Sequence, residues 1–205
     1  DPGSVVTFTF SEVPANFTDT DLTVVGGSVT GLVQDLLADP TGKTYTATFT
    51  ATDGFTGNGS ITVGTDWQDA AGNTGIGGSD SVVIDTENPT VTDVTASDLL
   101  ITDADTGAGT FSIAVTFNEA MDTLVAPALT FAPDVTGSLA FNSGSWDATG
   151  TIYTATYDVT DANVTVADIT VDVTGALDAS GNAQQDYTAA IEFNIDTENP
   201  TVAVD

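Results

Sequence analysis

The heptapeptide DTENPTV occupies residues 85–91 and returns unchanged at residues 196–202. Three more segments recur in the same order when the chain is laid over itself at a shift of about 107 to 111 residues. The segments FTFSE (8–12), YTATF (45–49) and DAAGN (69–73) correspond to VTFNE (115–119), YTATY (153–157) and DASGN (178–182). The chain therefore holds two copies of one module, which we place at residues 1–86 and 87–197. Residues 198–205 then begin a further linker or strand.

Each copy is predicted to consist of short β-strands, because Val, Ile, Thr, Tyr and Phe alternate with polar residues between clusters of Gly, Asp and Asn. The clearest strands are expected at 44–51, 61–67, 81–84, 110–117, 152–157, 169–174 and 190–195. About seven strands in about 100 residues is typical of an immunoglobulin-like sandwich. The predicted fold is all-β, with two tandem immunoglobulin-like β-sandwich domains in an extended arrangement. Because Glu12 comes so early in its copy, we expect the first domain to lack its first strand.

The composition excludes several classes of function. One Lys, no Arg and no His stand against 30 acidic residues, which gives a net charge of -29. Such a charge repels nucleic acid and anionic membranes. Without His or Cys there is no Ser-His triad, imidazole zinc site or thiol chemistry. We therefore expect no enzyme, no nucleic-acid partner and no membrane insertion, and we expect a monomer.

The residues resemble the tandem bacterial Ig-like repeats of large, type I secreted (RTX-type) surface adhesins. The resemblance rests on residues 10–12, on the DGFTGNG turn at 53–59, on the WQDAAGN segment at 67–73 and on the repeated junction heptapeptide. It implies an extracellular stalk on a bacterial cell surface, built of neighbouring repeats and with Ca²⁺ at or near the junctions. The second copy departs from the pattern because Trp146 lies in a Gly-Ser loop. We expect Val173 or Leu177 to replace Trp67 in its core.

Acidic and amide side chains are predicted to gather where the second domain begins. In an Ig-like sandwich the loops after the second and sixth strands lie at the end where the chain enters. That topology places Glu119, Asp122, Asp178 and Asn182 beside the linker residues Asp85, Glu87 and Asn88. Ca²⁺ takes six to eight oxygen ligands of these kinds, so the sequence predicts a calcium site there. The alternatives are a Pro-terminated linker and an ordinary hairpin turn.

A second candidate calcium site is predicted at the opposite end of the second domain. Asp103 and Asp105 would face the outgoing Asp196 and Glu198 there. The segment is not an EF-hand loop, because Gly107 is fifth rather than sixth and position twelve is Ala114. A solvated acidic loop is the alternative.

Three classes of function remain. The first is a structural extender of a calcium-stiffened, biofilm-type adhesin. The second is a module that itself binds carbohydrate, ice or another cell, which requires an exposed aromatic patch or a flat Thr array. The third is a glycosidase with two carboxylates, which we disfavour because no large insertion builds a cleft.

Overall fold

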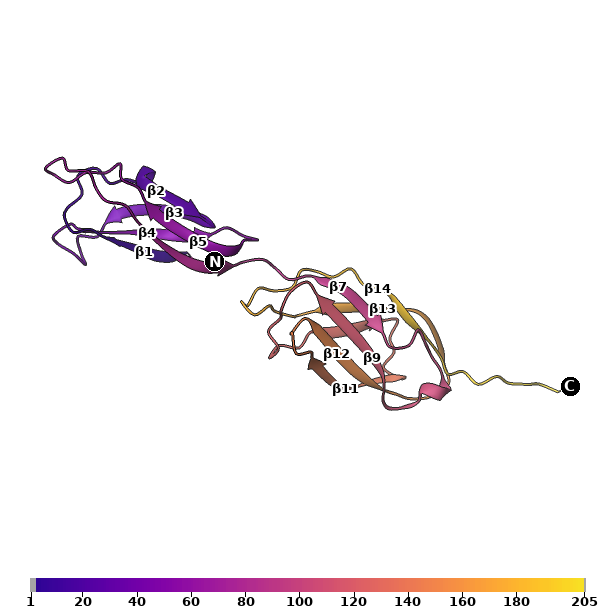
Figure 1. Ribbon diagram of the computed structural model, residues 1–205. Coiled ribbons are helices and arrows are strands. Elements are labelled where there is room, and N and C mark those ends of the chain that lie inside the picture. The colour runs from indigo at the N-terminus through magenta and orange to yellow at the C-terminus, as the bar shows by residue number, and fades with distance from the viewer. Residues whose placement is uncertain (1–2, 205) are drawn as a thin grey trace. The chain divides into compact units, whose positions relative to one another are not determined.

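The computed structural model describes residues 3–204, and the chain divides into two compact units, Asp1–Glu87 and Asn88–Asp205 (Figure 1). Almost all regular structure is β-strand, as the sequence predicts. The first unit contains β1 (Ser4–Thr9), β2 (Leu22–Val25), β3 (Gly27–Gln34), β4 (Thr44–Ala51), β5 (Thr56–Val63) and β6 (Gly78–Asp85), with a short 3-10 helix η1 (Asp19–Asp21).

The second unit repeats these strands and adds two before them. It contains β7 (Val91–Ala96), β8 (Leu100–Ile101), β9 (Gly107–Phe117), β10 (Ala128–Ala132), β11 (Leu139–Trp146), β12 (Ile152–Val159), β13 (Thr165–Thr174) and β14 (Ala190–Asp196), with η2 (Asp103–Asp105) between β8 and β9. Each unit is an immunoglobulin-like β-sandwich.

The two units share one strand order. The first has sheets β1-β4-β3 and β2-β5-β6, and the second has sheets β11-β12-β9-β7 and β10-β13-β14-β8. β1 therefore corresponds to β9 and β6 to β14. β7 adds to one edge in antiparallel fashion and β8 adds to the other in parallel. Within the described residues of the first unit, β1 and β6 are edge strands.

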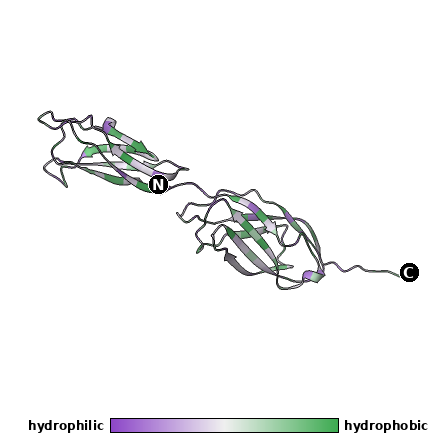
Figure 2. Ribbon diagram, viewed as in Figure 1, coloured by the Kyte–Doolittle hydropathy of each residue, from purple (hydrophilic) through white to green (hydrophobic). Residues whose placement is uncertain are grey.

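The core follows from the alternation of apolar residues in the strands, visible as green bands in Figure 2. In the second unit every second residue of β9 from Phe111 to Phe117 is buried, as period-two patterning requires. The core of the first unit is smaller, with Phe8, Phe17 and Ala47 buried and aromatic neighbours only partly covered. The difference arises partly because β7 and β8 contribute Val94, Ala96 and Ile101 to the core of the second unit alone.

Three sequence-based expectations about local structure were wrong. The segment 53–59, expected to be a turn, is partly strand, because β5 begins at Thr56. The strand expected at 61–67 ends early, because β5 ends at Val63. Position 59 of β5 requires glycine, because the Cβ of any other residue there would collide with the side chain of Ile84. The expectation that Trp146 lies in a loop was also wrong: Trp146 ends β11 and packs at a tilt against Phe117, with ring centroids 5.6 Å apart.

Candidate metal centre

Asp178 is held in a hairpin that joins β13 to β14. Its Oδ1 accepts hydrogen bonds from the backbone N–H groups of Ser180 and Asn182, both at 2.8 Å. Its Oδ2 accepts one from Nδ2 of Asn182 at 2.7 Å. Gly181 has a φ of +92°, which favours glycine and lets the loop reverse. The result is a carboxylate in a fixed orientation with its side chain 1% exposed.

Glu119 follows β9 and meets Asp178 from the other side. A carboxylate oxygen of Glu119 and one of Asp178 lie within 4.8 Å of each other, and Glu119 is half-buried. The backbone pairs the two loops, because Met121 forms a β-bridge with Asp178 and the N–H of Ala179 donates to the carbonyl of Ala120 at 3.3 Å. Two close carboxylates out of bulk water repel each other, so the pair favours a cation.

Asp122 and Asn182, the other two side chains predicted here, have local structural roles. Oδ1 of Asp122 accepts from the N–H of Leu124 at 2.9 Å and so caps its own turn. Asn182 donates to Asp178 as described above. The structure therefore brings Glu119, Asp178 and Asn182 together, while Asp122 turns its carboxylate to its own loop.

The linker residues Asn88–Thr90 are fixed to this same end of the second unit, which we name the upstream end. The carbonyls of Asn88 and Pro89 accept hydrogen bonds from Gln185, from its Nε2 at 3.3 Å and its backbone N–H at 2.8 Å. The N–H of Thr90 donates to Oδ1 of Asn118 at 2.7 Å. Because Asn118 precedes Glu119, the linker lies beside the carboxylate pair.

The preceding residues are fixed to the first unit. The N–H of Thr86 donates to the carbonyl of Phe55 at 3.0 Å, and its Oγ1 donates to the carbonyl of Thr52 at 2.7 Å. The hydroxyl of Thr56 donates to Oδ1 of Asp85 at 3.0 Å and to Oε2 of Glu87 at 3.3 Å. The linker thus passes from the first unit to the second between Glu87, which is hydrogen-bonded to Thr56, and Asn88, which is hydrogen-bonded to Gln185.

The downstream end of the second unit repeats this arrangement. The hydroxyl of Thr165 donates to Oδ1 of Asp196 at 3.0 Å and to Oε2 of Glu198 at 3.2 Å. The N–H of Thr197 donates to the carbonyl of Val164 at 2.9 Å. The two units therefore end in the same pattern of side chains and hydrogen bonds.

Asp103 and Asp105, predicted to face these residues, cap and form the short helix η2. Oδ2 of Asp105 accepts from the N–H and Oγ1 of Thr102, at 2.8 and 2.9 Å, and Asp103 is exposed. Among residues 3–204, Asp103, Asp105, Asp196 and Glu198 do not form a group of three or more carboxylates with ligand atoms within 4.8 Å.

The first unit carries a hairpin of the same design, which the sequence-based selection of site residues left out. Oδ1 of Asp69 accepts from the N–H groups of Ala71 and Asn73, and Oδ2 accepts from Nδ2 of Asn73 at 2.7 Å. These hydrogen bonds, with that from the Asn73 side chain as the largest, lower the pKa of Asp69. The internal repeat was the signal that could have found it, since residues 69–73 correspond to 178–182.

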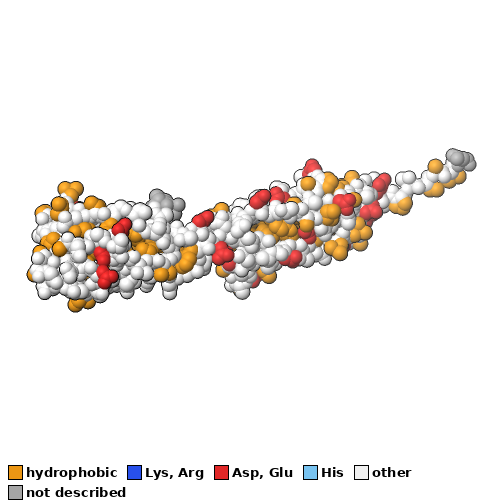
Figure 3. All heavy atoms as spheres, turned by 90° about the horizontal axis from the view of Figure 1, so that it is seen from above, with side chains coloured by type: hydrophobic (Ala, Val, Ile, Leu, Met, Phe, Trp, Pro, Cys, Tyr) orange, Lys and Arg blue, Asp and Glu red, His pale blue; other side chains and the backbone are white. Residues whose placement is uncertain are grey.

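The acidic residues as a whole are dispersed over the surface. On the face shown in Figure 3, carboxylates are scattered over both units and no Lys or Arg side chain is visible. Nζ of Lys43, the one lysine, donates to the carbonyl of Ser11 at 2.8 Å. Among the described residues no helix is long and apolar enough to span a membrane.

Comparison with known proteins agrees with this architecture. Residues 2–86 match the family model of a bacterial Ig-like domain. The first unit is therefore similar to a bacterial Ig-like repeat, and the second unit has the same strand order with two further strands. A comparison with curated proteins gives no significant match.

Proposed function

We propose that the chain is a non-catalytic extender segment of a bacterial cell-surface adhesin, in which Ca²⁺ stiffens the junction between neighbouring Ig-like units. The observation that carries the proposal is the short linker: Glu87 is hydrogen-bonded to the first unit and the next residue, Asn88, to the upstream end of the second, where the carboxylates of Glu119 and Asp178 meet. A hinge this short has few torsions to fix. One bridging cation can therefore restrict it.

The chain itself supplies further ligands. Asp85 lies three residues before Asn88, so its Cα stays within about 11 Å of the Cα of Asn88 whatever the hinge angle. Asp85, Glu87 and the side-chain oxygen of Asn88 are thereby kept near the upstream end. With Glu119 and Asp178 they offer a hard, oxygen-only ligand set suited to Ca²⁺. Asp196 and Glu198 would serve the next junction in the same way, with Asp103 and Asp105 as further candidate ligands at that end.

The expected affinity explains how such a site would work outside the cell. Extracellular calcium modules bind at about 10⁻⁴ to 10⁻³ M. Millimolar external calcium would fill the site, whereas cytosolic calcium would not, so the segment would stiffen only after export to the cell surface. At about tenfold excess over the dissociation constant, one site adds about 1.4 kcal/mol of stability.

Small-angle scattering and circular dichroism test the proposal. In millimolar calcium, at fixed ionic strength, we expect a longer and narrower distance distribution than in chelator, with a nearly constant β signal. Glu119→Gln should weaken the response. The matched control is Glu12→Gln, which changes the corresponding strand-end glutamate of the first unit and should leave the response intact. A scattering curve of the natural chain that does not change across millimolar calcium rejects the junction model.

The hollow in the first unit does not support a glycosidase. A groove of about 610 Å³ is present there, contrary to the expectation of no cleft, and it is lined by Asp80 and Asp85. These residues lie five positions apart on β6, so about 17 Å of extended strand separates them. The two carboxyl groups of a glycosidase lie within about 10 Å. We therefore expect no turnover of glycosides.

A direct adhesive role is the second candidate, favoured by one observation. The outward face of sheet β1-β4-β3 carries threonines in register, with Thr7 opposite Thr46 and Thr30 opposite Thr48. Exposed valines Val5 and Val33 interrupt the array, and twist keeps a sheet of this kind from being flat. Adsorption of the chain to ice or to a glycan surface that is lost in Thr48→Lys would favour this role over the extender.

A further inference from the structure

Glycine follows an Asp or an Asn at two places in the chain, Asp53–Gly54 and Asn58–Gly59. Such a glycine matters chemically, because it has no side chain to shield its backbone nitrogen from the preceding carboxyl or amide group. That nitrogen can attack the side-chain carbonyl carbon and close a succinimide ring. The two pairs are therefore the candidate sites of a spontaneous change in the backbone.

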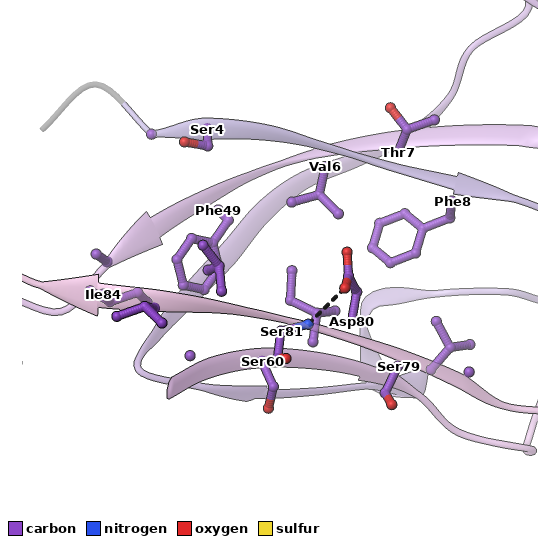
Figure 4. A pocket seen from close by; sticks show the side chains of 18 of the residues that line it. Ser4, Val6, Thr7, Phe8, Phe49, Ser60, Ser79, Asp80, Ser81 and Ile84 are labelled. Atoms are coloured by element: carbon purple, nitrogen blue, oxygen red, sulfur yellow. Dashed lines mark hydrogen bonds between the residues drawn. The ribbon is translucent and has the colours of Figure 1, made fainter. Parts of the chain in front are cut away.

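The fold protects Asn58–Gly59. Both residues lie in β5, which pairs with β6 along its whole length. Figure 4 shows the two strands side by side, with Ser60 of β5 opposite Ser81 of β6. In such a ladder a side chain stands perpendicular to the sheet, whereas the following N–H lies in its plane. Gly59 is also buried, next to the side chain of Ile84. Its nitrogen therefore cannot reach the side chain of Asn58 unless the sheet opens.

Asp53–Gly54 has the opposite surroundings, because the pair forms an exposed turn between β4 and β5. Gly54 has a φ of +69°, and no heavy atom of the described residues, apart from its chain neighbours, lies within 4 Å of a Cβ built there. Its N–H donates to the carbonyl of Thr86 at 3.2 Å, the long end of the usual range. Opening this hydrogen bond in a turn costs much less than opening a strand. The nitrogen of Gly54 is therefore accessible in the folded chain.

We propose that Asp53 isomerises spontaneously to isoaspartate in the folded protein. The backbone nitrogen of Gly54 attacks Cγ of the protonated Asp53 carboxyl group. The C–N bond forms, the Cγ–OH bond breaks, and the hydroxyl leaves as water with the N–H proton. Water then opens the succinimide at either carbonyl, which returns aspartate or gives isoaspartate, in which the chain runs through Cβ and Cγ. The mass and the charge of the protein stay the same.

The isomer adds one carbon to the backbone between residues 53 and 54. We expect it to break the hydrogen bond from Gly54 to Thr86, because the donor is displaced from its acceptor. The N–H of Thr86 donates to Phe55 and its hydroxyl to Thr52, which lie directly beside β5 and β4. The strands hold these two acceptors in place. The change is thus confined to the turn and leaves the linker fixed to the first unit.

Peptide mapping in chelator tests the proposal independently of calcium. The chain is kept for several weeks at physiological temperature and pH. Chymotrypsin then cuts after aromatic residues and isolates residues 50–55 and 56–67. A peptide with isoaspartate elutes separately at unchanged mass and is methylated by protein isoaspartate methyltransferase, and electron-transfer fragment ions locate the residue. We expect several-fold more isoaspartate at Asp53 than at any other Asp, and we expect residues 56–67 to keep the mass of the intact Asn58 amide.

Asp53→Glu should abolish the product at this position while it keeps the charge, because a ring with one more carbon closes much more slowly. The matched control is Asp161→Glu, in the corresponding turn of the second unit. There Ala162 follows, and Oδ1 of Asp161 accepts the N–H of Asn163 at 2.9 Å. This control should form as much isoaspartate at Asp53 as the natural chain. Isoaspartate at Asp53 that does not exceed the level at other Asp residues, or that trails deamidation of Asn58 in the folded chain, overturns the proposal.

Incubation in denaturant separates the effect of the fold from that of the sequence. The unfolded chain no longer protects Gly59, so Asn58 should then react several-fold faster than in the folded chain. Amide hydrogen exchange of the folded, aged chain measures the structural effect. The N–H of Gly54 should exchange several-fold faster in the isomerised fraction, and the N–H of Thr86 should keep its rate. An unchanged rate at Gly54 overturns the expected loss of its hydrogen bond.

Discussion

Phe10 and Phe117 occupy the same position of the repeat, yet each contacts a tryptophan from a different element. Trp67, in the loop after β5, lies 4.9 Å from Phe10 between ring centroids. At the position of Trp67 the second unit has Ala176, and Trp146 from β11 packs on Phe117 instead. A large ring packs on this phenylalanine in both units, but sequence spacing does not say which strand or loop supplies it. For that reason the prediction of Val173 or Leu177 as the substitute was wrong.

Tyr157 illustrates what burial does to a single ionisable side chain. It is 6% exposed, and its ring contacts Phe131 and Phe141 at centroid distances of 5.4 and 5.9 Å. Burial disfavours the charged phenolate, and together with nearby Tyr153 it raises the pKa of Tyr157 to about 12. The unfolded chain would release this proton near pH 10.

Stability should therefore fall as the pH rises from about 10 to about 12, because only the unfolded state loses the proton in that window. Tyr157→Phe keeps the ring and removes the hydroxyl. We expect the variant to lose about 2 kcal/mol less than the natural chain across the window. Denaturant unfolding at pH 7 and at pH 11 to 12 measures this, with the pH 7 pair as the control. Equal losses in both proteins would contradict the assignment.

At the scale of strands, the two units differ by β7 and β8, and this difference determines where the first unit is open. The alternating pattern predicted most strands, and the early position of Glu12 led us to expect fewer strands in the first unit. The start of β5 was missed because Gly57 and Gly59 are typical of turns. The place of Gly59 in the strand depends on the side chain of Ile84, which belongs to another segment.

Adding the two strands to the first unit should stabilise it. Residues 88–109 joined ahead of Gly3 would supply copies of Val94, Ala96 and Ile101 to the hollow between β1 and β6. Each buried aliphatic side chain contributes about 1.5 to 3 kcal/mol before the ordering cost. We expect the melting temperature of the first unit to rise by several degrees. Calorimetry measures this, and the control carries Asp at the three core positions.

At the scale of the whole molecule, the sequence predicted the repeat and the fold class, and of the side chains it placed at the upstream end the structure brings Glu119, Asp178 and Asn182 together. It did not separate Asp122 from Glu119 and Asp178, because all three lie at strand ends and only the backbone pairing of Met121 with Asp178 determines which carboxylates meet. It also did not show how short the hinge is. That depends on hydrogen bonds of Gln185 and Thr52, both far from the heptapeptide in sequence.

The calcium proposal depends on linker length, because Glu87 is hydrogen-bonded to the first unit and the next residue, Asn88, to the second. Inserting Gly-Ser-Gly-Ser between Glu87 and Asn88 leaves every ligand in place but lets Asp85 move about 14 Å farther from the carboxylates of the second unit. Asp85 and Glu87 then have a lower effective concentration at the site. We expect calcium to bind several-fold more weakly by calorimetry and to leave the scattering curve almost unchanged. The matched control inserts the same four residues after Gly54, in the exposed turn before β5, and should keep both responses. If the lengthened linker still stiffens in calcium to the same degree, the ion does not bridge the two units, and the carboxylates of Glu119 and Asp178 act within the second unit alone.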